Sequence, residues 1–261
     1  MPFRDTTETI AGCKTRIMRG GSGAPLLFLH GANGAAHWLP FMEALSERYD
    51  VIVPEHPGFG ASDMPDWLDN IGDLAFFYLD VIDHFGLDRV NVVGQSIGGW
   101  VAAEMATRND SKLASLILVA AAGIRIVGVR KPDMFLWSPE ETVRNLFHDQ
   151  SLAEKALANP PSTDEEQMVM LKNRLTTAKL GWQPRLYNPD LEKWLHRISV
   201  PTLILWGDND KVIQPEYGPA WADRIPGARL QTFAECGHLP HVEKADDYVA
   251  SVSSFIEESA R

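Results

Sequence analysis

The chain has 261 residues, 45% of them hydrophobic, which suffices for one large domain, or a domain with an insertion, around a substantial core. Its formal net charge of −11 disfavours nucleic acid and anionic membranes as partners, and no apolar run is long enough to span a membrane. The polar N-terminus lacks a signal-peptide-like apolar segment, and Cys13 and Cys236 form neither a disulfide framework nor a metal-binding pattern. We therefore expect a cytoplasmic protein without a bound metal.

Apolar runs of strand length alternate with segments of helical spacing along most of the chain. Residues 6–20 alternate in polarity and predict an antiparallel hairpin at the edge of the main sheet. The runs that follow are continuously apolar, as in strands buried on both faces. The expected strands are 25–29, 51–54, 90–93, 113–120, 202–206 and 230–233, and the expected helices are 38–49, 70–85, 100–107 and 242–256. This order predicts an α/β fold with a doubly wound, mostly parallel sheet.

The alternation stops between residues 122 and 199, where no strand pattern is evident. The segment has helical spacing at 139–147, 152–158 and 163–179, and proline-containing breaks separate these stretches. It is too long for a simple connection between two strands. We expect residues 1–121 and 200–261 to form the α/β core and residues 122–199 to form an inserted helical cap.

The most informative motif is a G-x-S-x-G pattern, Gly94 to Gly98, between the strand at 90–93 and the helix that follows. A serine on such a strand-to-helix turn is held in a strained backbone conformation that projects its hydroxyl above the sheet. The two glycines allow the strand and the helix to approach closely. Ser96 is therefore the candidate nucleophile.

A serine hydroxyl needs a base within hydrogen-bond reach, and the base needs an orienting acid. In this topology the order along the chain is nucleophile, acid, histidine. Of the eight histidines, only His238 and His241 follow every candidate acid loop, and Gly237 lets the loop turn the His238 ring towards the sheet. We expect His238 to be the base, and His241 to line the pocket or bond a neighbour.

The loop after the strand at 202–206 offers two carboxylates for the acid, Asp208 and Asp210. Asp208 also suits a turn-forming role, because aspartate bonds nearby backbone N–H groups. Local spacing therefore favours Asp210 only slightly.

The oxyanion of a tetrahedral intermediate needs hydrogen-bond donors. We expect one to be the backbone N–H of Ile97, directly after the serine. The second is expected from the loop His30 to Gly34, and the N–H of Ala32 is the candidate. A substrate pocket between this turn and the cap would have apolar walls and few polar anchors. The candidate pocket residues are Asn33, Trp38, Phe135, Trp137, Met168, Trp182 and Leu239.

Together these motifs resemble those of the α/β-hydrolase fold superfamily, and the resemblance covers nearly the whole chain. The matching segments are 30–31, 57–62, 94–99, 206–210 and 237–238. The resemblance implies Ser96, Asp210 and His238 as a catalytic triad, and residues 122–199 as a helical lid. Glu55 departs from the pattern, since relatives usually carry an aspartate there, but that position is generally structural.

The resemblance also narrows the chemistry. A serine nucleophile excludes the haloalkane dehalogenases and epoxide hydrolases, which use an aspartate. Hydrolases that cleave C–C bonds of meta-cleavage products typically have a tryptophan shortly after the catalytic histidine and an arginine in the lid. Here Leu239 follows His238, and Arg185 could supply the cation, although a surface salt bridge suits it better.

The sequence thus predicts a serine hydrolase that cleaves a small, fairly apolar carboxylic ester through an acyl-enzyme, without a cofactor. A C–C bond hydrolase of the meta-cleavage-product type is the alternative. A third hypothesis is a ligand-binding receptor on the same fold. We expect a small-molecule substrate and neither nucleic acid nor a membrane as a partner, and the sequence is compatible with a homodimer.

Overall fold

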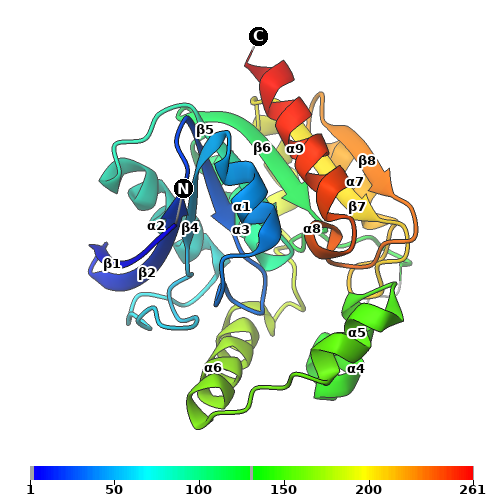
Figure 1. The fold of residues 1–261 in the computed structure, drawn as a ribbon. Coiled ribbons are helices and arrows are strands. Elements are labelled where there is room, and N and C mark those ends of the chain that lie inside the picture. Colours follow the sequence, from blue (N-terminus) through cyan, green and yellow to red (C-terminus); the bar gives the residue numbers. More distant parts are fainter. Residues whose placement is uncertain (1–2, 130–131, 261) are drawn as a thin grey trace.

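The computed structural model describes residues 3–129 and 132–260. An eight-stranded sheet in the order β1-β2-β4-β3-β5-β6-β7-β8 runs through the molecule (Figure 1). From β4 to β8 all neighbouring strands are parallel, and the pairs β1–β2 and β2–β4 are antiparallel. The strands are β1 Arg4–Ile10, β2 Cys13–Gly20, β3 Ala24–Leu29, β4 Tyr49–Pro54, β5 Val90–Gln95, β6 Leu113–Val119, β7 Thr202–Gly207 and β8 Arg229–Phe233. The predicted fold class and the predicted N-terminal hairpin are both confirmed.

Helices cover both faces of the sheet, and their apolar sides form two separate cores. One core lies under α2 (Ile71–His84), α3 (Ile97–Arg108) and α7 (Tyr217–Arg224). The other lies under α1 (Pro40–Ser46) and α9 (Ala245–Ser259), as Figure 1 shows. Alternate residues of a central strand enter opposite cores, because successive side chains of a strand point to opposite faces. In β3, for example, Leu27 and Leu29 join the first core, and Leu26 and Phe28 join the second.

The predicted helices 38–49 and 242–256 differ most from the structure at their ends, and the helix expected at 100–107 begins earlier, at Ile97. The first was expected to reach residue 49, but α1 ends at Ser46 and Tyr49 already pairs with Ala24 in the sheet. Strand pairing therefore overrides the helical spacing there. The last predicted helix, 242–256, is divided into a short helix α8 (Pro240–Glu243) and α9, since the backbone of Lys244, with φ −131° and ψ 47°, is not helical.

The segment 122–199, called the inserted segment below, is helical in its described part. It contains α4 (Pro139–Leu146), α5 (Gln150–Leu157), α6 (Asp164–Gly181) and the short 3₁₀ helices η1 (Met134–Leu136), η2 (Leu191–Lys193) and η3 (Leu195–Arg197). Apart from an isolated bridge between Gly123 and Tyr187, its described residues form no strand. Figure 1 shows α4, α5 and α6 set apart from the main layers of the fold. In the described ranges, no helix is both long and apolar enough to cross a membrane.

The packing of α3 against the sheet depends on glycine. A Cβ atom on Gly98 would lie 2.1 Å from the carbonyl oxygen of Leu29 and 2.5 Å from that of His30. A Cβ atom on Gly94 would lie 2.4 Å from the carbonyl oxygen of Gly98. Since these are backbone atoms of the sheet edge and the helix, no side-chain rotation can relieve such overlaps. Only glycine lets the first turn of α3 lie directly over the ends of β3 and β5.

We expect Gly98→Ala to lower the free energy of unfolding by at least about 3 kcal/mol, because a methyl group would overlap the Leu29 carbonyl. Urea unfolding followed by circular dichroism measures this. Gly86→Ala is the matched control: Gly86 has φ +59° and open space around its Cβ position, so the loss there should be about 1 kcal/mol. Equal losses for the two variants would contradict the packing argument.

Candidate active site

Ser96 lies at the turn between β5 and α3 in a backbone conformation that non-glycine residues rarely adopt, with φ 55° and ψ −115°. Its backbone is held on both sides. The N–H donates to the carbonyl of Val119 at 2.9 Å, and the carbonyl accepts from the N–H groups of Trp100 at 3.2 Å and Ala122 at 3.0 Å. Neighbouring strand and helix therefore maintain the strained turn, and the hydroxyl is left free to face a cavity.

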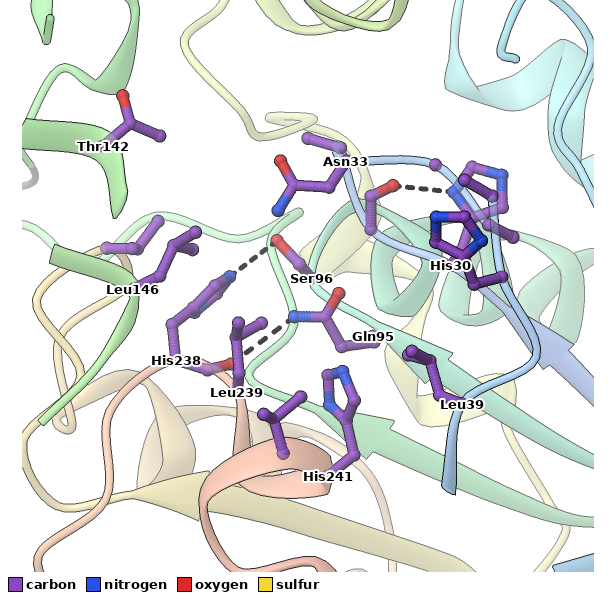
Figure 2. A pocket seen from close by; sticks show the side chains of 18 of the residues that line it. His30, Asn33, Leu39, Gln95, Ser96, Thr142, Leu146, His238, Leu239 and His241 are labelled. Atoms are coloured by element: carbon purple, nitrogen blue, oxygen red, sulfur yellow. Dashed lines mark hydrogen bonds between the residues drawn. The ribbon is translucent and has the colours of Figure 1, made fainter. Parts of the chain in front are cut away.

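The three residues expected to form a triad are joined in one chain of hydrogen bonds. His238 Nε2 lies 2.9 Å from Ser96 Oγ, and His238 Nδ1 lies 2.7 Å from Asp210 Oδ2. Figure 2 shows the first of these contacts at the edge of the cavity. Asp210 Oδ1 accepts from the N–H groups of Val212 and Ile213, so the carboxylate is held by donors on both oxygens. An acceptor-only carboxylate at Nδ1 places the ring proton there and leaves Nε2 free to accept the serine proton.

The two carboxylates of the acid loop have different surroundings. Asp208 is exposed, and its Oδ1 accepts from the N–H of Cys236 at 3.2 Å and from the side chain of Asn209. Its carboxylate therefore links the acid loop to the histidine loop, and among the described residues its hydrogen-bond partners do not include the imidazole of His238. Asp210 is buried and bonds that ring directly. The geometry thus resolves the choice that local spacing left open.

Ala32 and Ile97 each present a backbone N–H without a partner among the described residues, and both residues adjoin Ser96. The orientation of the Ala32 N–H follows from its neighbour. The carbonyl of Gly31, in the same peptide unit, is held by His30 Nδ1 at 2.7 Å. Because carbonyl and N–H point in opposite directions across a trans peptide, this bond turns the Ala32 N–H away from His30.

A buried pair of histidines supports the oxyanion loop. The N–H of His56 donates to His30 Nε2 at 2.9 Å, so His30 carries its proton on Nδ1 and donates it to the Gly31 carbonyl. Burial lowers the pKa of His30 to about 4, and burial followed by the neighbouring His30 lowers that of His56 well below its ordinary value. Both rings are therefore neutral at pH 7, which preserves this set of donors and acceptors.

The loop that carries His238 is held by the inserted segment. The N–H of His238 donates to the carbonyl of Leu146, the last residue of α4, at 2.9 Å. The carboxylate of Glu243 accepts from the N–H groups of Gly237 at 2.7 Å, His148 at 2.8 Å and Asp149 at 2.9 Å. One carboxylate thus joins the histidine loop to the connection between α4 and α5. Sequence patterns gave no signal for this contact.

A cavity of about 260 Å³ lies beside Ser96. Figure 2 shows several of its side chains, among them Asn33, Thr142, Leu146 and His241. Its lining residues are Phe28, His30, Gly31, Ala32, Asn33, Gly34, Ala35, Ala36, His37, Leu39, Met42, Gln95, Ser96, Met134, Trp137, Thr142, Leu146, Val212, His238, Leu239, His241 and Val242. Within the described chain, this lining contains no Asp, Glu, Lys or Arg. The cavity therefore offers neutral hydrogen-bonding groups and apolar surface, and no ionic partner.

Three of the seven predicted pocket residues, Asn33, Trp137 and Leu239, line this cavity. Trp38 and Met168, which were also predicted to line the pocket, lie outside the lining of this cavity. The ring of Trp38 stacks on Phe3 with centroids 4.9 Å apart and donates to Glu43, outside the lining. Met168 is 63% exposed on α6, because helical spacing at that point turns its side chain to the surface.

The other two predicted pocket residues, Phe135 and Trp182, pack on each other with ring centroids 5.4 Å apart, outside the lining of the cavity at Ser96. Arg185 lies over the ring of Trp182 at 3.4 Å and pairs with Asp133 at 3.1 Å. Arg185 is likewise outside the cavity lining. The salt-bridge interpretation of this arginine is therefore confirmed, and as the structure stands its charge is neutralised by Asp133.

Other lining residues were not singled out from the sequence. Gln95 precedes the nucleophile, and its side-chain amide donates to the carbonyl of His238 at 3.4 Å. Thr142 and Leu146 come from α4 and reach the cavity only through the tertiary packing of the inserted segment, so no local pattern could have identified them. The position of Gln95 beside the serine was the one available signal.

His241 lines the cavity, as one of the two sequence alternatives proposed, and its ring packs against Phe41 and Tyr248 at centroid distances of 5.0 and 5.9 Å. Burial, followed by the neighbouring His238, lowers the pKa of His241 to about 3.

Burial similarly raises the pKa of the Cys236 thiol to about 12, so this free cysteine is an unreactive thiol. Among the described residues, no His, Cys, Asp and Glu side chains are grouped as a set of metal ligands.

Comparison with known proteins agrees with this architecture. The family model of the alpha/beta hydrolase fold matches residues 24–245. The chain belongs to this family.

Several relatives are similar over nearly their whole length. The chain is 26% identical over 260 residues to a 2-hydroxy-6-oxo-2,4-heptadienoate hydrolase of Pseudomonas putida, covering 94% of this chain and 93% of the relative. It is 28% identical over 251 residues to a 2-hydroxy-6-oxo-6-phenylhexa-2,4-dienoate hydrolase of Comamonas testosteroni, covering 87% of this chain and 86% of the relative. Among solved structures, a meta-cleavage product hydrolase, CumD, superposes with a TM-score of 0.82 at 23% identity, covering 97% of this chain and 98% of that one, which shows the same fold.

Replacing the two carboxylates of the acid loop one at a time tests their assignment. We expect Asp210→Asn to lower kcat about 10⁴-fold, because the amide cannot hold the imidazole in the required tautomer. Asp208→Asn should change kcat less than about 3-fold, since an amide oxygen still accepts from the Cys236 N–H. Steady-state turnover of p-nitrophenyl acetate measures both, and the reverse order of effects would refute the assignment.

The neutral state of His241 predicts a pH dependence of stability. Its pKa is near 3 in the folded protein and near 6.5 in the unfolded chain, so the unfolded chain binds more protons between these values. Its contribution is fully present above pH 6.5 and is lost as pH falls towards 3. Lowering the pH from 6.5 to 5 should therefore lower the free energy of unfolding of the native chain by about 2 kcal/mol more than that of the His241→Leu variant.

Urea unfolding at the two pH values measures this difference. The exposed His196→Gln is the matched control and should leave the pH dependence unchanged. An unchanged pH dependence in His241→Leu would show that the ring is not held neutral by burial.

Proposed function

We propose that the protein is a serine-dependent hydrolase that cleaves the carbon–carbon bond beside a ketone of a small conjugated substrate. The observation that carries the serine chemistry is the hydrogen-bonded chain from Ser96 through His238 to Asp210 beside the cavity. The choice of bond is supported by relatives whose names describe hydrolases of 2-hydroxy-6-oxo-dienoates.

In the proposed reaction His238 accepts the proton of Ser96 while Oγ attacks the ketone carbon. The oxygen that becomes negative accepts hydrogen bonds from the backbone N–H groups of Ala32 and Ile97. The tetrahedral intermediate collapses with cleavage of the adjacent C–C bond, and His238 returns the proton to the departing carbon, whose negative charge is delocalised over the conjugated chain. Water, deprotonated by His238, then hydrolyses the acyl ester on Ser96 and restores the hydroxyl.

We also propose that residues 122–199 serve as a lid over this site. Met134, Trp137, Thr142 and Leu146 of this segment contribute to the cavity lining, which supports a role in enclosing substrate and excluding water.

A carboxylic ester is the second candidate substrate, and the uncharged lining of the cavity favours it. A dienoate carries a carboxylate, and a buried carboxylate without a cationic partner is costly. The described lining has no Arg or Lys, and Arg185 is paired with Asp133 elsewhere. The same Ser96 attack on a neutral ester needs no ionic partner, and its alcohol leaves in place of the carbon chain.

Two substrates and one variant separate these candidates. With 2-hydroxy-6-oxo-6-phenylhexa-2,4-dienoate, C–C cleavage should release benzoate and remove the absorbance of the conjugated chain. With p-nitrophenyl acetate, ester cleavage releases p-nitrophenolate. We expect Ser96→Ala to lower both rates at least about 10⁴-fold, and fluorophosphonate labelling to map to Ser96 in the native protein alone.

Turnover of the dienoate at a kcat/KM well above that of the ester supports the C–C hydrolase. Turnover of the ester alone identifies the second candidate. Turnover that survives Ser96→Ala would refute both.

A further inference from the structure

In the described part of the chain, three side chains of helix α6 form hydrogen bonds with the core. Lys172 donates to the carbonyls of Gly60 and Ser62 at 2.9 and 2.6 Å, and Thr176 donates to the carbonyl of Gly58 at 2.6 Å. Both residues reach the loop at 58–62. The third side chain, Asn173, also reaches the oxyanion loop at 31–34.

Both ends of the Asn173 amide are used. Its Nδ2 donates to the carbonyl of Asn33 at 2.9 Å, and its Oδ1 accepts from the N–H of Gly60 at 2.8 Å. The residue is 5% exposed, so neither bond is readily replaced by water. Reversing the amide would place N–H against N–H and oxygen against oxygen, and the partners therefore fix its orientation.

The Asn33 carbonyl belongs to a tight turn, in which the N–H of Gly34 donates to the carbonyl of Gly31 at 3.1 Å. Gly34 has φ +83°, and a Cβ atom there would lie 2.6 Å from Asn173 Nδ2. Glycine at this position therefore both forms the turn and lets Asn173 approach. Ala32 and Asn33 are the two central residues of the turn.

The turn that presents the Ala32 N–H is thus held at two points. At one end the Gly31 carbonyl is bonded by His30, and at the other the Asn33 carbonyl is bonded by Asn173. If the second bond is lost, the turn is held only at its Gly31 end, and the Ala32 N–H can shift relative to Ser96. A donor placed in advance at the position of developing charge is what stabilises an oxyanion, so a small rotation has a kinetic cost.

We propose that Asn173 is a positioning residue of the oxyanion hole, through which the inserted segment sets the direction of the Ala32 N–H. This inference rests on the proposed serine mechanism and applies to either candidate substrate. It assigns to α6 a part in transition-state stabilisation in addition to enclosing the cavity.

The test is Asn173→Ala, assayed with p-nitrophenyl acetate. Removing a complete oxyanion donor costs about 10²- to 10³-fold in kcat, so a displaced donor should cost about 10- to 100-fold, with KM changed less than about 2-fold. The second readout is the affinity for two ketone inhibitors that differ only in carrying a trifluoromethyl or a methyl group on the carbonyl. A trifluoromethyl ketone forms a tetrahedral adduct with serine and places its oxygen in the oxyanion hole, and the methyl ketone binds without an adduct. The variant should lose affinity for the first by the same factor as kcat and retain affinity for the second.

Two further variants separate positioning from general loosening of α6. Thr176→Val removes the bond of the same helix to Gly58 without touching the oxyanion loop, and should retain kcat within about 2-fold. Asn173→Asp keeps an acceptor for the Gly60 N–H but places an oxygen against the Asn33 carbonyl, and should lose as much as Asn173→Ala. Circular dichroism and thermal unfolding establish whether each variant is folded. If Asn173→Ala does not fold, Asn173→Asp takes its place in the test.

Three outcomes would overturn this inference: a native kcat in Asn173→Ala, equal losses of affinity for the two ketones, or an equal effect of Thr176→Val on kcat. The proposed function would still stand in these cases if the native chain shows Ser96-dependent turnover. A native chain without Ser96-dependent turnover overturns the proposed function, and this inference with it.

Discussion

The close approach of α3 to the ends of β3 and β5 is the constraint on which the site depends. Gly98 brings the first turn of the helix against the carbonyls of Leu29 and His30, and Ser96, two residues earlier in the same turn, has a strained backbone with φ 55°. The same contact places the N–H of Ile97 beside the loop that begins at His30. Nucleophile and oxyanion loop are therefore neighbours because two strands and one helix pack without side chains between them.

The remaining groups come from loops at the same edge of the sheet, since the carboxyl ends of parallel strands all lie at that edge. Asp210 follows β7 and His238 follows β8, and neighbouring strands bring these loops into register. The inserted segment then holds two of the loops. Leu146 accepts from the backbone of His238, and Asn173 donates to that of Asn33. The segment is thus bonded directly to catalytic loops.

Charge is kept out of the cavity while hydrogen-bonding capacity is retained. His30, His56 and His241 are buried, and their lowered pKa values keep the rings neutral near pH 7 because burial disfavours the cation. No Asp, Glu, Lys or Arg side chain lines the described cavity. Such a site suits a substrate that becomes negative only in the transition state, where N–H donors act strongly in surroundings of low polarity.

The sequence by itself determined the fold class and the order of the elements along the chain, because these follow from local patterns. It also singled out Ser96 and His238, which the structure places within hydrogen-bond distance of each other. Periodicity reports which faces are buried, and the glycines around Ser96 report a sharp turn. The tertiary structure decided what depends on contacts distant in sequence. Asp208 and Asp210 lie two residues apart on one loop, and only the tertiary structure shows that Asp210 is the one that reaches the imidazole. Trp38 and Met168 are apolar like residues that line the cavity, but they face elsewhere. The bonds of Leu146 and Asn173 join residues about 90 and 140 positions apart, and no local pattern encodes such a contact.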